Sequence, residues 1–141
     1  MRKEFRQRLT KEYRYAVTKM QEVKEPAKKL YYFSVIFGEA QRVLNWEWDR
    51  DLALIYTVTQ HVHTQINTTM QIPGLGLLPM DWATVYEKLT QLASDLADYY
   101  EKVENDDNKE EMYQVLGRLA EIAYAISGNG SYLYEKGILK L

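Results

Sequence analysis

The chain of 141 residues has the length of one ordinary domain and can bury a sizeable core. It contains no cysteine, which excludes disulfides, thiolate catalysis and cysteine-based zinc sites. The net charge of −2 conceals an asymmetry, because residues 1–29 hold ten Lys and Arg against four Glu, whereas residues 30–141 hold eight against sixteen acidic residues. The charged N-terminus lacks the apolar stretch of a secretion signal, so a cytoplasmic location is expected.

Residues 3–24 have the pattern of a basic amphipathic helix. The apolar positions recur at helical spacing, and they are Phe5, Leu9, Tyr13, Ala16, Met20 and Val23. The opposite face carries Lys3, Arg8, Lys11, Arg14 and Lys19. We predict a basic N-terminal helix, covering residues 1–25, that packs on the rest of the domain or extends from it.

A second helix is expected to begin near Pro26, because proline disfavours helical geometry in the residue before it and is well tolerated in a first turn. Its apolar positions follow at spacings of three and four, and they are Leu30, Phe33, Phe37, Ala40 and Leu44. This spacing is typical of helices that pack nearly parallel or antiparallel.

Residues 52–80 contain no Asp, Glu, Lys or Arg, although the whole chain is 27% charged. Polar residues interrupt every part of this run, which excludes a transmembrane helix. A helix over about residues 47–71 is predicted from one apolar face, formed by Trp48, Leu52, Ile55, Val62, Ile66 and Met70 together with Thr59. The side chains on its other faces are neutral. Their burial costs less desolvation free energy than the burial of charged side chains, so these faces suit a bundle interior or a subunit interface. The candidate interface residues are Gln65, Thr68, Leu75 and Leu77.

Residues 27–71 admit two interpretations. One continuous helix fits the apolar pattern, because no Gly or Pro lies between Glu39 and Ile72. A turn at Asn45 fits as well, since Asn is a good N-cap and would bring a group of acidic residues near the positive end of the next helix. That group is Glu47, Asp49 and Asp51. The carboxylates that cluster near this turn, which also include Glu39, are interpreted as first-turn acids that complement the helix dipole and not as metal ligands. We favour the turn, and the continuous helix remains open at this point.

Two more helices complete the pattern after an apolar loop at residues 72–79 that is bracketed by prolines. Asp81 is a suitable N-cap for a helix whose apolar positions are Trp82, Val85, Leu89, Leu92, Leu96, Tyr99 and Val103. An acidic turn at residues 105–108 precedes a last helix with Met112, Leu116, Leu119, Ala123 and Ile126, which ends before the glycines of residues 128–130. No β-alternation is long enough to build a sheet. The sequence therefore predicts an all-α antiparallel bundle of four to five helices, one domain over residues 1–141.

The patterns of ionisable residues do not match those of metal sites. His61 and His63 are two residues apart, so on a helix they point about 200° away from each other and do not share a metal ion. The Glu-x-x-His pattern of carboxylate-bridged metal bundles is missing. The glycines and serines of residues 127–131 lack the lysine of a phosphate-binding loop and are expected to cap a helix. No metal and no cofactor is predicted.

Two functions of different classes fit these observations. The first is a non-enzymatic assembly or adaptor protein that forms a homo-oligomer through the uncharged run. The second is a ligand-binding or catalytic bundle with a site around Trp46, Trp48, Tyr56 and His61. A buried pocket lined by those four side chains would favour the second function, and a flat uncharged surface would favour the first.

The basic N-terminal helix also has two interpretations. Clustered cations bind nucleic acid by neutralising phosphates and releasing counterions, and the candidate residues here are Lys3, Arg8, Lys11 and Arg14. The same cations can instead pair with an acidic protein surface, in particular with the acidic remainder of this chain. Both interpretations require an amphipathic basic helix, so the sequence leaves both open. A membrane partner is not expected.

Overall fold

The computed structural model describes residues 1–71, 82–102 and 109–126. These residues form five helices, which are α1 (Lys3–Glu22), α2 (Pro26–Leu44), α3 (Arg50–Gln71), α4 (Trp82–Lys102) and α5 (Glu110–Ile126). The predicted loop at 72–79 with Leu75 and Leu77, the acidic turn at 105–108 and everything after residue 126 lie outside the described residues. The start of α2 at Pro26 confirms the boundary predicted from that proline.

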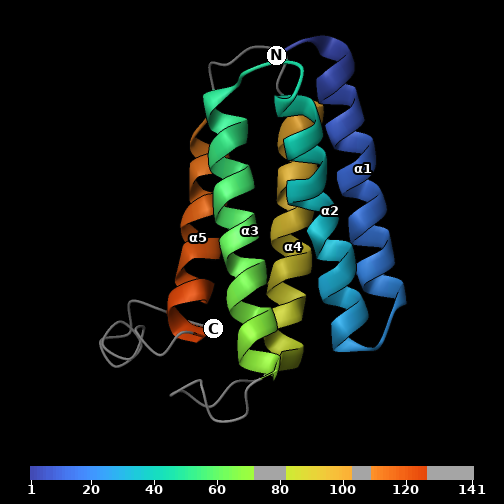
Figure 1. The fold of residues 1–141 in the computed structure, drawn as a ribbon. Helices are drawn as coiled ribbons and strands as arrows, with labels where there is room; N and C mark the ends of the chain where they lie inside the picture. The colour runs from blue at the N-terminus through green and yellow to red at the C-terminus, as the bar shows by residue number, and fades with distance from the viewer. Residues whose placement is uncertain (72–81, 103–108, 127–141) are drawn as a thin grey trace.

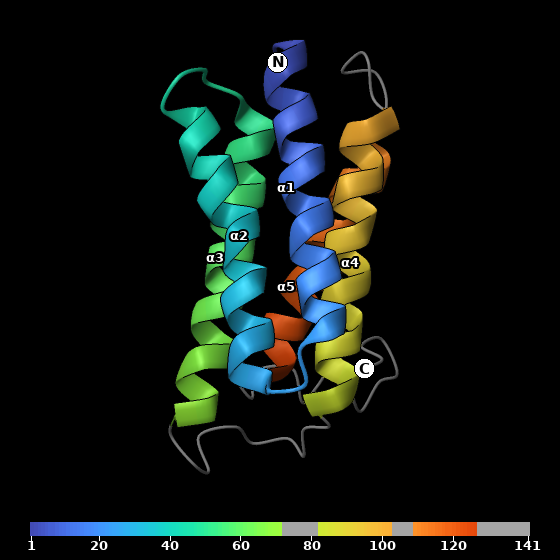
Figure 2. The same cartoon turned by 90° about the vertical axis from the view of Figure 1, so that its right-hand side faces the viewer.

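The helices form a closed ring in which α1 packs on α2, α2 on α3, α3 on α5, α5 on α4, and α4 on α1 (Figures 1 and 2). Helix α2 also contacts α4 across the interior. Neighbouring helices run antiparallel except α3 and α5, which run in the same direction. The prediction of an all-α antiparallel bundle is confirmed.

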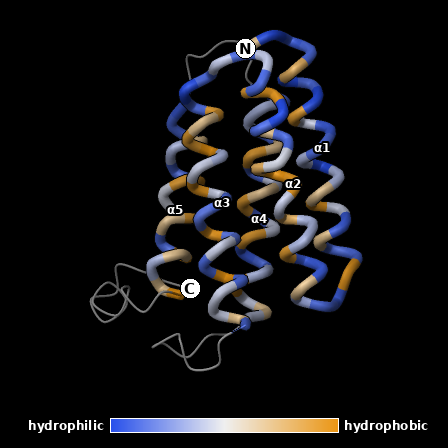
Figure 3. The backbone as a smooth tube through the Cα atoms, viewed as in Figure 1, coloured by the Kyte–Doolittle hydropathy of each residue, from blue (hydrophilic) through white to orange (hydrophobic). Residues whose placement is uncertain are grey.

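The apolar positions predicted from the sequence form one core. The basic helix α1 belongs fully to it, since the side chains of Leu9, Tyr13, Ala16 and Met20 are completely buried. In α4 and α5 the buried side chains include Val85, Leu89, Leu92, Leu96, Met112, Leu119 and Ile126. Figure 3 shows the hydrophobic positions recurring along each helix. Helix α1 therefore packs on the bundle and does not extend from it.

Residues 27–71 form two helices, and the turn between them begins where it was predicted but ends later. Asn45 is the C-cap of α2, with its N–H bonded to the carbonyl oxygen of Gln41. The N-cap of α3 is Asp49, whose Oδ1 accepts a hydrogen bond from the N–H of Leu52 at 2.8 Å. The predicted start near residue 47 was therefore wrong, because Asp49 satisfies a first-turn N–H that Asn45 is too distant to reach. Trp48 consequently lies in the turn, 75% exposed, and is absent from the buried face.

Helix α3 depends on tertiary packing because its sequence is rich in β-branched residues, which form helices poorly. Leu52, Ile55, Val62 and Ile66 are fully buried, and they hold α3 against its neighbours. Thr59 is buried among them, and its hydroxyl donates a hydrogen bond to the carbonyl oxygen of Ile55. The buried face predicted for this helix is confirmed at these positions.

A buried carboxylate joins the beginning of α3 to the beginning of α5. Lys109 Nζ lies 2.5 Å from Asp51 Oδ2, and the hydroxyl of Tyr113 donates to Asp51 Oδ1 at 2.9 Å. Burial raises the pKa of the Asp51 carboxyl, but the Lys109 ammonium and the Tyr113 hydroxyl oppose this effect and bring the pKa below its ordinary value. The ion pair therefore stabilises the charged carboxylate in the folded state.

The variant Asp51→Asn should lose about 2 kcal/mol of unfolding free energy at pH 7, because a hydrogen-bonded ion pair is removed and Lys109 is left with a neutral amide. The folded-state pKa is depressed, so the carboxylate contributes its stability above the ordinary pKa of about 3.9 and loses it as the pH falls through the folded-state value. Chemical denaturation at several pH values should show a steady difference down to about pH 5 that closes below about pH 4.

The matched control is Asp95→Asn, since the Asp95 carboxylate accepts a hydrogen bond from Gln91 of its own helix. This control should change stability much less. A difference between Asp51→Asn and the parent that persists unchanged to pH 2 would contradict the assignment.

Candidate functional site

Two of the four basic residues proposed for nucleic acid form ion pairs with the acidic remainder of the chain. Arg14 Nη2 lies 2.6 Å from Asp98 Oδ1 and also pairs with Glu101 of α4. Arg8 Nε lies 2.9 Å from Glu39 Oε2 of α2. Lys3 and Lys11 are exposed on the outer face of α1. Pairing with the acidic remainder of the chain thus accounts for Arg14, which has two carboxylates as neighbours.

Glu39 is a buried acid that holds two guanidinium groups. Its side chain is in the second half of α2 and only 1% exposed, and it accepts hydrogen bonds from Arg8 and from Arg42 one turn later. Grouping Glu39 with first-turn acids was wrong, because it belongs to α2 and not to the start of α3. Its hydrogen bond and charge raise the pKa of Arg8. The charge of Glu12 also raises the pKa of Arg8, so a second carboxylate acts on this pair of guanidinium groups.

The Tyr13 hydroxyl lies at the centre of the bundle, close to this acid. Burial, followed by the charge of Glu39, raises the pKa of Tyr13. Its ring meets the edge of the Tyr100 ring at 5.9 Å between centroids, and among the described residues the hydroxyl has no hydrogen-bond partner. Tyr13 therefore remains a protonated phenol at neutral pH and does not provide a general base.

Helices α2 and α3 together present a surface without charge, which we call the uncharged face. Residues 30–38 of α2 and 52–71 of α3 contain no charged side chain, and the two helices lie side by side (Figure 1). Its outward positions on α2 are Ala27, Tyr31, Ser34, Gly38 and Gln41, at spacings of four and three. Its outward positions on α3 are Thr57, Gln60, Thr64, Asn67 and Gln71, all of them exposed.

An aromatic contact joins the two helices beneath this face. The rings of Phe37 and His63 meet edge to face, with their centroids 5.2 Å apart. Burial lowers the pKa of His63, so its imidazole is neutral at pH 7. The face therefore carries no charge at this position either.

The interface residues predicted from sequence lie beside this face. Gln65 and Thr68 are partly buried and lie on the side of α3 away from His63. Leu75 and Leu77 are outside the described residues. The outward stripe at Thr57, Gln60 and Thr64 was missed because a sequence that is neutral on every side does not reveal which side faces solvent.

The four residues of the alternative ligand-binding or catalytic site are not brought together. Trp46 and Trp48 are 77% and 75% exposed in the turn before α3. His61 is exposed about 16 Å further along α3, at 1.5 Å per residue from Arg50. Tyr56 is partly buried between these levels. Side chains this far apart do not line one pocket.

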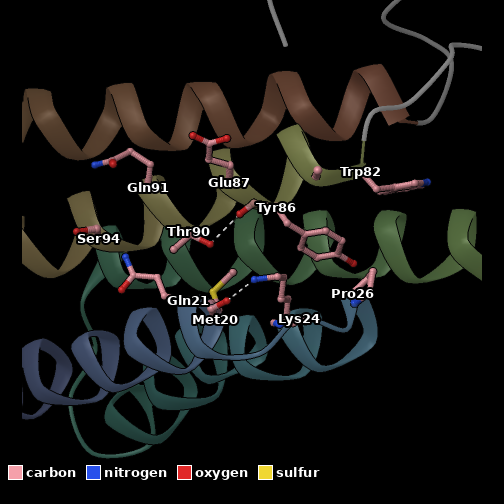
Figure 4. A pocket seen from close by; sticks show the side chains of 12 residues that line it. Met20, Gln21, Lys24, Pro26, Trp82, Tyr86, Glu87, Thr90, Gln91 and Ser94 are labelled. Carbon is pink, nitrogen blue, oxygen red and sulfur yellow. Dashed lines mark hydrogen bonds between the residues drawn. The ribbon is translucent and has the colours of Figure 1, made fainter.

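An open groove of about 560 Å³ lies at the other end of the bundle (Figure 4). Lys24, Pro26 and Lys29 line one side of it, and residues of α4 from Trp82 to Ser94 line the other. Lys29 Nζ donates to the carbonyl oxygen of Met20 at 2.5 Å. The sequence did not predict the groove because its two walls are more than fifty residues apart.

Two of the polar groups that line the groove, those of Tyr86 and Lys29, hold helices together. The hydroxyl of Tyr86 lies 2.9 Å from Met70 Sδ and so links α4 to the end of α3. Burial raises the pKa of Tyr86 to about 12, so this hydroxyl also keeps its proton. Lys29 is bonded to the backbone of α1, whereas Gln21, Lys24 and Glu87 also line the groove with polar side chains.

Comparisons with known proteins add no family to this description. No protein-family model, no curated protein and no solved structure matches the chain. Within the described residues, no three His, Asp or Glu side chains gather closely enough to hold a metal ion. None of the described helices has the length and apolar composition needed to cross a membrane.

The variant His63→Gln should reduce the pH dependence of stability between about pH 7 and pH 5. The unfolded chain binds a proton at His63 near pH 6.5, whereas the folded chain resists it, so parent stability falls as the pH decreases through this range. Chemical denaturation at several pH values measures the effect. His61→Gln, at an exposed position, is the matched control and should retain the parent's dependence. Equal dependence in the parent and both variants would contradict the role of His63.

Proposed function

We propose that this protein is a non-enzymatic assembly or adaptor protein whose uncharged face binds the same face of a second copy across a two-fold axis. The observation that carries the proposal is the pair of adjacent outward stripes, on α2 and α3, without one charged side chain. Such a face can be buried without the large desolvation cost of unpaired charges, and its hydroxyls and amides can form hydrogen bonds across an interface.

The choice of residues on α3 supports a partner. Thr57, Thr64 and Asn67 are exposed positions where Lys, Glu or Ala would favour the helix more. These residues lower helix propensity and form no ion pairs along the helix that could offset the loss. This composition does not suit a helix surface that faces solvent. It is expected if the surface is buried in an assembly.

A second copy of this chain suits the face better than a highly charged partner. The chain carries a net charge of −2, so two copies repel each other weakly. The uncharged face avoids this repulsion. Each outward stripe is roughly 21 Å long and the two helices together are roughly 20 Å wide, so the face of about 420 Å² would form the central part of an interface of roughly 800 Å² per partner. Tyr31, 68% exposed, provides an aromatic side chain of the kind enriched in interfaces.

Gly38 gives the face a flat position at its centre. A Cβ atom added there would meet nothing within 4 Å, so the monomer does not require glycine at this position. Glycine inside a helix costs about 1 kcal/mol relative to alanine. The monomer therefore gains nothing from Gly38. On a face that is buried in a dimer, this glycine would allow the partner backbone to approach closely.

The double variant Gln60→Lys/Thr64→Lys should remain folded and lose self-association. A two-fold axis places like charges from both copies near each other, so the dissociation constant should rise at least about tenfold, equivalent to about 1.4 kcal/mol. Sedimentation equilibrium or light scattering over a concentration series measures it. A parent that is a 16.6 kDa monomer at every accessible concentration would refute the proposal.

Gln114→Lys on α5 is the matched control for surface charge, because Gln114 is exposed and lies outside the uncharged face. It should associate as the parent does. Ile66→Lys provides the opposite control, since Ile66 is completely buried and a charge there should destroy folding and assembly together.

The pair Gly38→Gln and Gly117→Gln tests close approach at the face. Gly117 on α5 also has open space around an added Cβ, so both changes should raise monomer stability by about 0.5 kcal/mol through helix propensity. Gly38→Gln alone should weaken self-association, by about tenfold. Thermal melts at low concentration and sedimentation at high concentration separate the two effects. Equal association in both variants would show that the partner does not contact Gly38.

A further inference from the structure

A small notch of about 170 Å³ opens beside the N-terminal part of α1, where the turn at residues 45–49 passes close to it. Its lining comes from both elements and consists of Phe5, Arg8, Arg42, Val43, Asn45 and Trp46. At about 30 Å³ per water molecule the notch holds roughly six waters, the space of a small planar ring or a phosphate group. The notch is separate from the outward stripes of the uncharged face.

Two guanidinium groups meet at the notch and are held in place by a buried acid. Arg8 and Arg42 share the single carboxylate of Glu39, which is 1% exposed, while their own side chains are 53% and 65% exposed. Each guanidinium group has five N–H donors, and the bonds to Glu39 use only part of them. The remaining donors lie at the rim, oriented before any ligand arrives, and a guanidinium fork matches the oxygens of a phosphate.

The notch also has an aromatic wall that is exposed to water. Trp46 is 77% exposed, although a large indole in a folded chain is usually well covered. The Arg2 guanidinium lies over the Phe5 ring, 5.4 Å from its centroid, while the Glu47 carboxylate accepts a hydrogen bond from the Arg2 N–H and pairs with the N-terminal amino group. The amide of Asn45 can donate and accept hydrogen bonds between these groups.

We propose that the notch binds a nucleotide, with its phosphate on the guanidinium groups of Arg8 and Arg42 and its base against Trp46. Aromatic side chains that stack on bases, next to cations that follow the backbone, are the arrangement by which proteins hold single-stranded nucleic acid. A single strand is therefore the source we expect. The proposal does not depend on self-association, because none of these residues belongs to the outward stripes.

This site differs from the one that the basic helix suggested. Arg8 is retained, Arg42 and Trp46 come from outside the basic helix, and Arg14 is excluded by its two carboxylate neighbours. Lys3 and Lys11 contribute through the general positive field of α1 and not through contact in the notch.

The test is a titration of fluorescently labelled oligothymidylate with the full chain, followed by anisotropy at two salt concentrations. The parent should bind, and more tightly at low salt. Trp46→Ala should lower the affinity roughly tenfold, because one stacking contact is lost. Arg42→Gln should lower the affinity and reduce the salt slope by about 0.7, the value for one phosphate contact on a single strand.

The controls are equally exposed residues outside the notch. Trp48→Ala and Arg118→Gln should bind within about twofold of the parent, since less than 0.5 kcal/mol is involved. Trp46→Phe keeps an aromatic ring and should retain most of the affinity, which separates stacking from a general defect in folding. Thermal melts of each variant confirm that it is folded.

Two further titrations identify the source of the nucleotide. If thymidine monophosphate binds as tightly as the oligonucleotide and depends on the same residues, the ligand is a free nucleotide and a strand is excluded. No binding of either probe at low salt would overturn the proposal, as would equal losses in Trp46→Ala and Trp48→Ala. Binding of anionic vesicles through Trp46, with no binding of nucleotides, would overturn it in favour of a lipid surface.

Discussion

The buried carboxylate of Glu39 constrains both surfaces described above. A carboxylate that is 1% exposed must be paired, because an unpaired charge in the interior is very costly. Its partners come from two helices, Arg8 of α1 and Arg42 of α2, so the pairing fixes how these helices lie against each other. The same pairing orients Glu39 toward α1. The outward surface of α2 is thereby left neutral, while two guanidinium groups meet at the notch.

Among the described residues, some charges of the two oppositely charged parts form ion pairs between helices. Arg14 joins α1 to the acids of α4, and Lys109 joins α5 to Asp51 of α3. The basic helix and the acidic remainder therefore explain how the helices pack better than they identify a partner. Two further features of the surface are the neutral face on α2 and α3 and the pair of guanidinium groups beside Trp46 that share the Glu39 carboxylate. Raw composition indicates neither location.

The sequence predicted the architecture because the apolar spacing of three and four residues is a property of each helix by itself. The positions Leu9, Leu89 and Leu119 are buried as that spacing indicated, and Pro26 begins α2. The predictions failed where two local patterns competed. Trp48 continued the apolar register but lies in a turn, because the Asp49 side chain caps α3 one residue later. Glu39 was grouped with the first-turn acids, but it lies within α2 and pairs with Arg8, thirty-one residues away, as well as with Arg42 of its own helix.

The sequence by itself determined that this chain is an all-α bundle, that its first helix is amphipathic and basic, and that its third helix is neutral on every side. Tertiary structure decided which neutral side faces outward, since α3 buries one side against α2 and α5. It also decided which cations are neutralised, and it brought Phe5 and Arg8 to Trp46. The physical reason is that apolar periodicity is a local property, which determines the buried side of each helix over a few residues. Ion pairs and notches join residues that are distant in the sequence, and only the packing of the helices brings these residues within a few ångströms.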